Sequence, residues 1–568
     1  MKKLFYQIKN IIKKILPHFL LDWYHFSLAF LAALIYGFPS RKLKVIGITG
    51  TSGKSTVLEM TSNILEEAGY KVASLSSIRF RLAGKEESNN LRMTLPGRFF
   101  VQRFLRKAVN YGCEYAVLEI TSEGIKQHRH SFIDFKVAAL TNLSPEHIEA
   151  HGGFEKYKQA KQKLFKVTKR IHVINLDDEN SKFFLGFPAK EKYLYGINKE
   201  PLNNNFKFIK AAEIQTGDKG VKFVTEGTEF NLQILGKFNV YNALAAISIA
   251  KSQGVGLRIC KKSLESFKGM PGRMEKVVSA PFKVFVDYAI THNALEKVYE
   301  TLVKNHKPKN NQLICVFGSC GGGRDKWKRP VLGEIASRYC NQIILTNEDP
   351  YDENPDEILA MIKSGTLKAG FSTKNLYEIV DRRMAIRKGL ELAKPDDIVI
   401  ITGKGCESSI CLAKGERISW SDKLTVQEAL ESPTPRYQFL EHRADLKIQV
   451  FGRTKEELFL NAMLAMIEYL KPDFKHPETN VEQEITVKST DSTTLLADFL
   501  NEALYLIQVN KEIYSRVSFD MFTNKEIIAK LSGQKVEAFG EDIKAVTYHN
   551  LEINQKNNSW EAIVLFDI

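Results

Sequence analysis

Short apolar stretches alternate with longer segments of helical pattern over most of the chain. The first apolar stretch, at 44–49, is followed by a glycine-rich turn and by a helical pattern from about residue 55 to 69. Similar stretches stand at 72–75, 115–120, 137–141 and 171–175. Nearly continuous apolar runs between helical segments are typical of a mostly parallel sheet covered by helices. We therefore predict an α/β domain.

A second series of the same kind begins near Pro271. Its predicted strands lie at 284–287, 313–318, 342–346 and 397–402, again separated by helical patterns. The segment 431–437 then carries two prolines and indicates a linker. Beyond it, period-two patterns and a helix at about 455–470 predict an α+β domain. The expected divisions are 1–40, 41–270, 271–432, a linker at 433–436, and 437–568.

The N-terminal segment places basic residues before an apolar stretch that runs from Phe19 to Phe38. Asp22 and His25 interrupt this stretch. The uninterrupted part, from Phe26 onward, is shorter than the roughly 20 residues of a membrane span. We predict a helix that packs on the domain or lies on its surface, with peripheral membrane contact as the alternative.

Composition limits the classes of protein to which the chain can belong. With 44% hydrophobic and 26% charged residues, the chain is neither disordered nor fibrous. The 81 Lys and Arg against 66 Asp and Glu give a net charge of +15, which suits nucleotides, nucleic acid or an anionic membrane without choosing among them. Seven cysteines without a CxxC pair or zinc-ligand spacing indicate a reduced, cytoplasmic setting.

The glycine-rich turn after the first predicted strand has the chemistry of a phosphate loop. Its backbone N–H groups would surround a polyphosphate at a helix N-terminus, Lys54 would reach the β- and γ-phosphates, and Ser55 or Thr56 would hold Mg²⁺. The strict P-loop pattern fails, because Ile48 stands where it requires glycine. We expect ATP to be bound by Gly50, Thr51, Ser52, Gly53, Lys54, Ser55 and Thr56.

Further motifs follow the phosphate loop along the chain. These are E-I-T-S-E-G-I-K-Q-H-R from Glu119, T-N-L-S-P-E-H ending at His147, and Y-K-Q-A-K ending at Lys161. The chain thus resembles the Mur ligase family, which forms amide bonds with ATP. Glu119 and His147 are side chains that could face Mg²⁺ near the phosphates. The resemblance implies that Lys161 is carbamylated and joins them.

Two later motifs carry the same resemblance. In G-K-F-N-V-Y-N, Asn239 and Asn242 are implied to bind adenine, although asparagine at a helix start is also a common cap. In P-G-R-M-E, Arg273 is implied to neutralise phosphate in the transition state. Asp287 is included among the residues that we expect to contact the nucleotide.

Other motifs resemble the branch of the family that adds the third residue of the muramyl peptide. The implied contacts to a UDP-muramyl peptide are Thr94, Leu95, Thr121, Gln127 and Arg129. The implied contacts to the incoming amino acid are Arg329, Glu348, Asp349, Gly403 and Glu407. The chain departs from the typical residues of the family at Ile290, His292, Asn293 and Cys406.

The choice of amino acid depends on residues 348–351. Enzymes that add diaminopimelate carry D-N-P-R there, whereas this chain reads E-D-P-Y and lacks the arginine that would bind a second carboxylate. The acidic loop favours an amine-bearing side chain such as that of lysine or ornithine; a solvated acidic turn is the alternative. The segment 1–40 is also short for the family's uridine-binding domain, which leaves recognition of UDP open.

From Tyr437 onward the chain resembles archease, a small protein that assists the RNA-splicing ligase. The resembling stretches include F-L-E-H-R-A-D, ending at Asp445, and the terminal F-D-I. The resemblance implies a calcium ion held by Asp445, by Asp567 and by the terminal carboxylate of Ile568, and such oxygen ligands suit Ca²⁺.

Together these observations predict a P-loop Mur ligase central domain, a Rossmann-like Mur ligase C-terminal domain and a small archease domain. The expected activity is ATP- and Mg²⁺-dependent addition of an amino acid to a UDP-muramyl peptide in the cytoplasm. Two alternatives stay open. The ligase could act on another peptide acid of the folate or polyamide kind, or it could be a degenerate nucleotide-binding scaffold attached to an activator of an RNA ligase.

Overall fold

A computed structural model describes most of the chain. The described residues are 18–89, 91, 93–146, 148–203, 205–305, 311–431, 436–440, 445–452, 454–473, 480–556 and 559–568. Residues 1–413 with 419–423 form one compact unit, and residues 414–418 with 424–568 form another. Each unit has its own hydrophobic core.

The first unit begins with a nine-stranded sheet in the order β4-β3-β2-β5-β1-β6-β7-β8-β9. Strand β1 (Lys44–Thr49) lies in its centre, parallel to both β5 (Tyr115–Glu119) and β6 (Phe135–Leu140). The phosphate loop therefore begins at the carboxyl edge of a buried sheet. The other strands are β2 Val72–Leu75, β3 Arg79–Leu82, β4 Lys85–Ser88, β7 Ile171–Asn175, β8 Glu191–Gly196 and β9 Lys207–Lys210.

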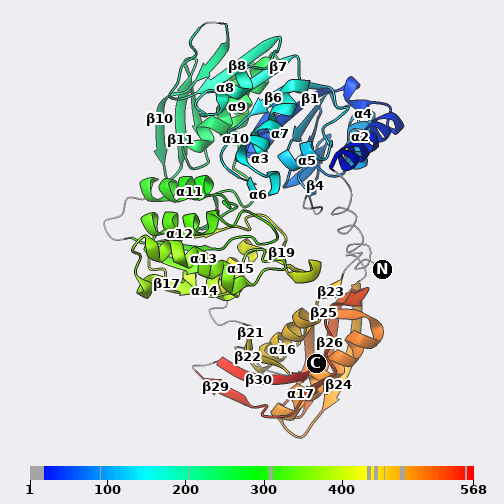
Figure 1. Ribbon diagram of the computed structural model, residues 1–568. Helices are drawn as coiled ribbons and strands as arrows, with labels where there is room; N and C mark the ends of the chain where they lie inside the picture. The colour runs from blue at the N-terminus through cyan, green and yellow to red at the C-terminus, as the bar shows by residue number, and fades with distance from the viewer. Residues whose placement is uncertain are drawn as a thin grey trace. The chain divides into compact units, whose positions relative to one another are not determined.

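Helices cover both faces of this sheet (Figure 1). Because side chains of a strand alternate, Ile46 and Ile48 of β1 pack with α3 and α9, whereas Val45 packs with α4 and α7. The helices are α3 Lys54–Glu67, α4 Arg98–Asn110, α5 Ser122–Lys126, α6 Ile148–His151, α7 Phe154–Val167, α8 Ser181–Leu185, α9 Phe238–Ser252 and α10 Leu257–Ser266.

Three parts of this domain were not predicted from the sequence. One is the pair of strands β8 and β9, which extends the sheet beyond β7. Strands β3 and β4 form an antiparallel hairpin at the sheet edge. A separate three-stranded sheet is built from β10, β11 and β12, and its stacked Phe223 and Phe230 rings extend the core over α9. Its bounds are β10 Ala212–Gly217, β11 Gly220–Thr225 and β12 Thr228–Leu232.

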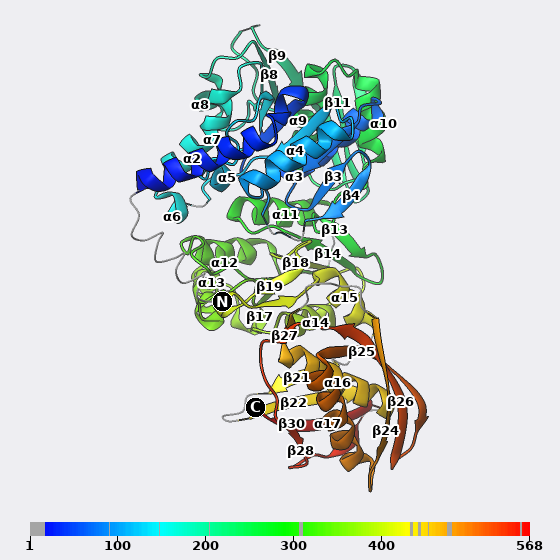
Figure 2. The ribbon, with the colours of Figure 1, turned by 90° about the vertical axis from the view of Figure 1, so that its right-hand side faces the viewer.

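The predicted N-terminal helix is present as α2 (His18–Ile35), which a short 3₁₀ turn, η1 (Pro39–Lys42), connects to β1. Helix α2 lies alongside α4 on the outside of the domain (Figure 2). Among the described helices, none is long and apolar enough to cross a bilayer.

The second α/β domain of this unit contains a six-stranded sheet in the order β13-β14-β18-β15-β16-β17. The four predicted strands are confirmed as the parallel strands β14 Lys283–Asp287, β15 Leu313–Phe317, β16 Gln342–Leu345 and β18 Ile398–Thr402. The remaining elements are β13 Glu275–Val278, α11 His292–Asn305, α12 Lys328–Tyr339, α13 Pro355–Lys368, η2 Thr373–Asn375, β17 Leu376–Glu378, α14 Arg382–Leu392 and β19 Ser409–Cys411. The elements that follow, η3 Ala413–Gly415, β20 Arg417–Ser419 and α15 Asp422–Glu431, contain the points at which the chain passes between the two units.

The second unit packs two long helices, α16 (Lys455–Leu470) and α17 (Ser492–Asn510), against antiparallel sheets (Figure 2). The helix expected at about 455–470 is confirmed by α16. One sheet contains β21 Tyr437–Leu440, β22 Leu446–Gly452, β28 Ala545–Thr547, β29 Ile553–Lys556 and β30 Ser559–Asp567. The other strands are β24 Asn480–Lys488, β25 Glu512–Phe522 and β26 Glu526–Lys535, with the short pair β23 Pro472–Asp473 and β27 Ala538–Phe539.

Candidate active site

The phosphate loop joins β1 to α3. Two of its glycines cannot be replaced by another residue without a clash. Gly50 and Gly53 have φ angles of 150° and 81°. A Cβ atom on Gly50 would lie 1.9 Å from the Thr141 hydroxyl oxygen, and one on Gly53 would lie 2.5 Å from the Asn242 amide oxygen. The loop is therefore enclosed tightly by its neighbours, and its N–H groups are fixed at the start of α3.

Asn142 holds this loop from the end of β6. Its side chain accepts a hydrogen bond from Ser52 N at 2.9 Å and donates one to Ser52 O at 3.0 Å. Its carbonyl oxygen accepts from Thr51 N at 2.9 Å. Sequence reasoning quoted the motif at 141–147 but assigned a role to His147 alone. His147 lies outside the described residues, so its role as a Mg²⁺ ligand stays a prediction.

Ser55 and Glu119 form a site that fits Mg²⁺. Ser55 Oγ donates to Glu119 Oε2 at 2.9 Å, and Ser77 N donates to the same oxygen at 3.0 Å. Lys54 Nζ lies 3.9 Å from Glu119 Oε1. A serine hydroxyl beside a buried carboxylate offers the oxygen ligands that Mg²⁺ prefers. Lys54 and Ser55, predicted from the phosphate loop, and Glu119, predicted from a separate motif, therefore lie together.

Lys161 lies behind the phosphate loop with only 2% of its surface exposed. Its Nζ donates to Gly50 O at 2.8 Å. Burial lowers the pKa of Lys161 well below its ordinary value, and the nearby charge of Lys54 lowers it further. A lowered pKa favours the neutral amine, which is the form that adds to CO₂. The surroundings of Lys161 fit the predicted carbamylation.

The two asparagines predicted to bind adenine lie at the start of α9. Asn239 Nδ2 donates to Leu235 O at 2.7 Å, and Asn242 Nδ2 donates to Asn239 Oδ1 at 2.8 Å. Both are buried. Because Asn242 also lies against Gly53, the pair supports the phosphate loop. Contact of the two asparagines with adenine stays a prediction.

Arg273 begins the second α/β domain beside the loop that contains Gly403. A Cβ atom on Gly272 would lie 2.2 Å from Cys406 N, so these two loops are in direct contact. The Arg273 guanidinium carbon lies 4.3 Å from the centre of the Tyr288 ring. Burial raises the pKa of Asp287, and the charge of Arg273 opposes this shift. Arg273 and Asp287 therefore lie near each other, and their contact with the nucleotide stays a prediction.

The two α/β domains are joined by polar contacts that sequence reasoning did not assign. Lys328 Nζ donates to Glu146 Oε1 at 3.3 Å and to Ile290 O at 2.9 Å. The Asp325 carboxylate accepts from the backbone N–H groups of residues 148 and 149 at 3.2 and 2.9 Å. Asp325 and Lys328 belong to the G-G-R-D-K-W-K-R-P motif. Spacing alone gave no signal of their partners, which lie about 180 residues away in the chain.

The acidic loop is not the solvated turn that the sequence left open. Glu348 and Asp349 are buried, with 3% and 5% of their surfaces exposed. Asp349 Oδ1 accepts from Lys404 Nζ at 2.8 Å, and Lys404 also donates to Glu407 Oε2 at 2.5 Å. Cys320 donates to Glu348 at 2.7 Å, and burial raises the pKa of Glu348. The interpretation as a solvated turn is therefore wrong for these two residues.

Arg329 is held inside the domain, with 1% of its surface exposed. Its guanidinium donates to Glu353 Oε2 at 3.0 Å and to Cys320 O at 3.1 Å. In this arrangement Arg329 positions the loop that follows β16. Direct contact between Arg329 and an amino acid stays a prediction.

The residues predicted to contact the muramyl peptide come together in a segment that we call the acceptor arm, residues 94–95 and 121–129. Arg129 donates to Gln127 Oε1 at 2.7 Å and also to Leu95 O. Thr121 caps α5 by accepting from Gly124 N at 3.1 Å. Arg98, which sequence reasoning missed, donates to Gln127 O at 2.9 Å. The arm is thus tied to α4.

The second unit places the residues predicted to bind calcium at one end of a strand pair. Leu446 of β22 lies opposite Phe566 of β30, which brings Asp445 and Asp567 to the same end. Lys544 Nζ lies 3.7 Å from Asp567 Oδ1 and donates to Ile568 O at 2.8 Å. Within the described part of the chain, no three His, Cys, Asp or Glu side chains form a metal cluster. The calcium site therefore stays a prediction.

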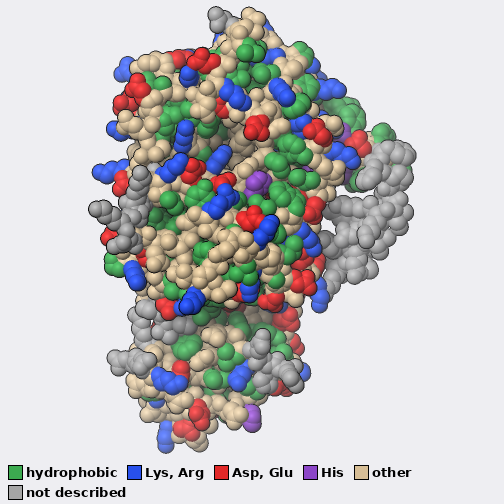
Figure 3. Space-filling view, turned by 60° about the vertical axis from the view of Figure 1, so that its left-hand side comes forward, with side chains coloured by type: hydrophobic (Ala, Val, Ile, Leu, Met, Phe, Trp, Pro, Cys, Tyr) green, Lys and Arg blue, Asp and Glu red, His purple; other side chains and the backbone are tan. Residues whose placement is uncertain are grey.

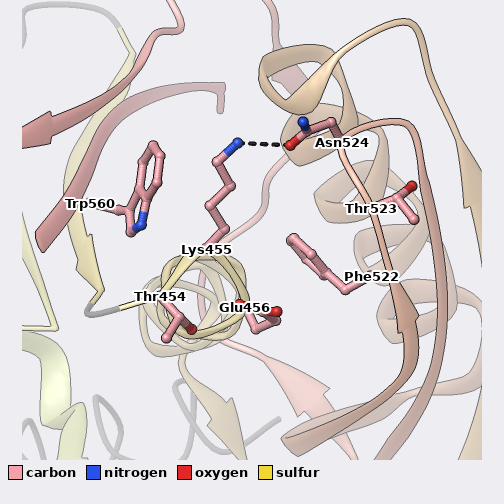
Figure 4. A pocket seen from close by; sticks show the side chains of 7 residues that line it. All are labelled: Thr454, Lys455, Glu456, Phe522, Thr523, Asn524 and Trp560. Atoms are coloured by element: carbon pink, nitrogen blue, oxygen red, sulfur yellow. Dashed lines mark hydrogen bonds between the residues drawn. The ribbon is translucent and has the colours of Figure 1, made fainter.

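An open cavity of about 560 Å³ lies at the opposite end of β30, where Trp560 pairs with Gly452. Lys455 stands between the rings of Trp560 and Phe522, and its Nζ donates to Asn524 Oδ1 at 2.9 Å (Figure 4). Thr454, Glu456 and Thr523 complete the lining. The cavity is thus separate from the end of the strand pair that carries Asp445 and Asp567.

Comparison with known proteins gives matches along most of the chain. Residues 48–250 match the Mur ligase middle domain, residues 272–405 the Mur ligase glutamate ligase domain, and residues 437–568 the archease protein family. The chain is 38% identical over 388 residues to a UDP-N-acetylmuramoyl-L-alanyl-D-glutamate--2,6-diaminopimelate ligase of Caldanaerobacter subterraneus, covering 67% of this chain and 77% of the relative. It is 35% identical over 430 residues to a UDP-N-acetylmuramyl-tripeptide synthetase of Roseiflexus, covering 71% and 82%.

A solved structure of a folylpolyglutamate synthase from Mycobacterium tuberculosis shares the fold. The TM-score is 0.55 at 16% identity, and the match covers 76% of this chain and 98% of that one. At this identity the likeness concerns the fold alone, so it does not favour a folate acceptor. The sequence relatives are Mur ligases that form peptide bonds in peptidoglycan precursor synthesis. The chain belongs to the Mur ligase family of ATP-dependent, ADP-forming ligases and carries an archease domain at its C-terminal end.

Proposed function

We propose that this chain joins an amino acid to the free carboxyl group of a UDP-muramyl peptide in the cytoplasm, at the expense of ATP. One observation carries the proposal: Lys54, Ser55 and Glu119 lie together at the phosphate loop, with the buried Lys161 behind it. This set provides charge neutralisation and metal ligands for phosphoryl transfer. The relatives named for the same chemistry support the assignment.

The reaction has two steps. The acceptor carboxylate attacks the γ-phosphorus of ATP and gives an acyl phosphate and ADP. The amino group of the incoming amino acid then attacks the acyl carbon, phosphate leaves, and loss of a proton gives the amide. Lys54 and Arg273 neutralise charge on the transferred phosphoryl group, and the acceptor arm positions the carboxylate. When bound, Mg²⁺ would be held by Ser55, Glu119, His147 and carbamylated Lys161, and would add positive charge at the phosphates.

We propose lysine or ornithine as the incoming amino acid. Tyr351 stands where an arginine would bind a second carboxylate, and a Cβ atom on Gly322 would lie 2.5 Å from its ring, so the ring covers the Gly322 turn. Glu348 and Asp349 are buried near it, and Asp349 already pairs with the amine of Lys404, so the chemistry of this surface favours an amine over a carboxylate. Gly403 and Glu407 lie on the same side of the domain, against Glu348 and Lys404 respectively.

With UDP-muramyl dipeptide as acceptor, we expect lysine or ornithine to be used with a kcat/KM about tenfold or more above that of diaminopimelate. Tyr351→Arg should shift this ratio toward diaminopimelate, because the guanidinium can pair with its second carboxylate. ADP release and the mass of the product measure both effects. A preference of the unaltered chain for diaminopimelate would show that another residue binds the second carboxylate.

We further propose that the archease domain assists an RNA-splicing ligase with calcium held by Asp445, Asp567 and the terminal carboxylate of Ile568. The pairing of β22 with β30 supports this, because it places Asp445 and Asp567 at one end of the strands. The full chain should accelerate guanylylation of such a ligase by GTP, and Asp567→Ala should reduce the acceleration about tenfold. Asp520→Ala, at an exposed position of β25, is the matched control. Equal acceleration by both variants would contradict this site.

We also propose that the ligase contacts the inner face of the cytoplasmic membrane through its N-terminal segment. Basic residues precede the apolar stretch that forms α2. Such a segment suits an anionic lipid surface.

A further inference from the structure

Helix α2 has the reverse of the usual surface arrangement. The residues buried under it are small, namely Ala29, Ala32 and Ala33, all at most 2% exposed. Its large side chains face outward: 69% of Trp23 and 60% of Ile35 are exposed. Helices of a globular domain normally bury their large apolar side chains. The exposed set is Leu20, Trp23, Tyr24, Leu31, Leu34 and Ile35, whereas the half-exposed Phe26 and Phe30 also pack against Phe132.

The charge of the segment that adjoins α2 indicates which kind of surface the helix binds. Residues 1–21 contain five lysines and neither aspartate nor glutamate. On the face of the molecule in Figure 3, basic and acidic side chains are interspersed, so the excess charge of the chain is not gathered there. An apolar helix face adjoining a purely basic segment suits anionic lipid headgroups over an acyl layer. A protein partner or a second copy of this chain would need no such run of lysines.

The inner side of α2 holds the acceptor arm. Asp22 Oδ1 lies 2.9 Å from His128 Nε2, and the ring of Phe26 meets that of His128 edge-on at 5.5 Å. His25 contacts the Arg98 guanidinium, which in turn donates to Gln127 O. The same helix therefore exposes its apolar face on one side and fixes the backbone of the arm on the other.

We infer that an anionic membrane surface binds α2 and thereby tightens binding of the acceptor peptide. The inference rests on the proposed function, because it assigns a regulator to the same acceptor site. Contact with lipid covers the exposed face of α2 and holds the helix in place. The contact of Asp22, on the helix, with His128, in the arm, then orders the arm. Since coupling between two binding events is reciprocal, the acceptor strengthens membrane binding by the same factor.

The test uses the full chain with vesicles of phosphatidylcholine, with and without phosphatidylglycerol. We expect co-sedimentation with the anionic vesicles and a decrease of about fivefold or more in the KM for UDP-muramyl dipeptide when they are present. Trp23→Asp should abolish both effects and keep the KM measured without vesicles. Leu202→Asp, a fully exposed apolar residue outside α2, is the matched control and should change neither.

A second variant separates membrane binding from the coupling. Asp22→Ala removes the contact with His128 but leaves the apolar face intact, so it should bind vesicles and lose the change in KM. Vesicle binding that does not depend on phosphatidylglycerol or on Trp23 would overturn the proposal that an anionic membrane surface binds α2. A dimer in solution that Trp23→Asp dissociates, without vesicle binding, would assign the face to a second copy.

Turnover distinguishes the remaining outcomes. An unchanged KM with vesicles bound would overturn the coupling and leave the proposed ligase activity standing. Absence of turnover both with and without vesicles would overturn the proposed function, and the coupling with it.

Discussion

Lys54→Ala is expected to lower kcat/KM for amide formation about 10³-fold, the size of effect seen when a group that stabilises transition-state charge is removed. Lys54 is the first residue of α3, and its Nζ lies 3.9 Å from Glu119 Oε1 and donates to Thr51 O at 2.9 Å. The ammonium is thereby held between the phosphate loop and the metal site, where a nucleotide would place its phosphates. Release of ADP with UDP-muramyl dipeptide and lysine measures the loss.

Lys71→Ala is the control for this prediction, because Lys71 is an exposed lysine just before β2 and outside the site. It should retain the activity of the unaltered chain. Both variants should unfold at similar temperatures, because Lys54 Nζ donates within its own loop, to Thr51 O, and its ion pair with Glu119 is long, at 3.9 Å. A loss below tenfold for Lys54→Ala would mean that another cation neutralises the phosphates.

The central parallel strands of both α/β domains could be predicted because buried parallel strands are short, continuous apolar runs. Strand β1 was predicted with its observed bounds, Lys44–Thr49. The β10–β12 sheet escaped this reasoning, because β10 is mostly exposed and carries no such run. Helix α2 was predicted as a helix, but its sequence did not reveal that alanines are buried while Trp23 faces outward. Which side chains of a helix point inward depends on the surface against which the helix packs, and other segments of the chain form that surface.

The candidate site likewise has one part that could be predicted from the sequence and another that only the fold shows. The phosphate loop is contiguous in sequence, so its lysine and hydroxyls could be assigned from one motif. Contacts between distant segments could not, and these include the clamp of Asn142 on Ser52 and the pair of Lys328 with Glu146. Arg329 illustrates the limit, since the motif identifies the residue but only the fold shows its guanidinium paired with Glu353.

Lys161→Ala is expected to reduce kcat about 10²- to 10³-fold, and acetate at high concentration should restore part of the activity. Carbamylation turns the amine into a carboxylate-like group, which acetate can mimic in the space that the shortened side chain leaves. The unaltered enzyme should lose activity in CO₂-free buffer and recover it with bicarbonate. Because burial lowers the pKa of Lys161, its neutral, reactive amine persists to lower pH than that of an exposed lysine, and carbamylation falls as the pH drops below that lowered pKa.

Acetate must fail to rescue Lys54→Ala, because a carboxylate cannot replace an ammonium that neutralises phosphate. This contrast separates restoration of a metal ligand from a general effect of salt. If Lys161→Ala kept its activity without acetate, the hydrogen bond from Lys161 to Gly50 O would be a support for the loop alone. Ser55 and Glu119 would then hold the cation without a carbamate, and the fall in activity at low pH would have to arise from another group.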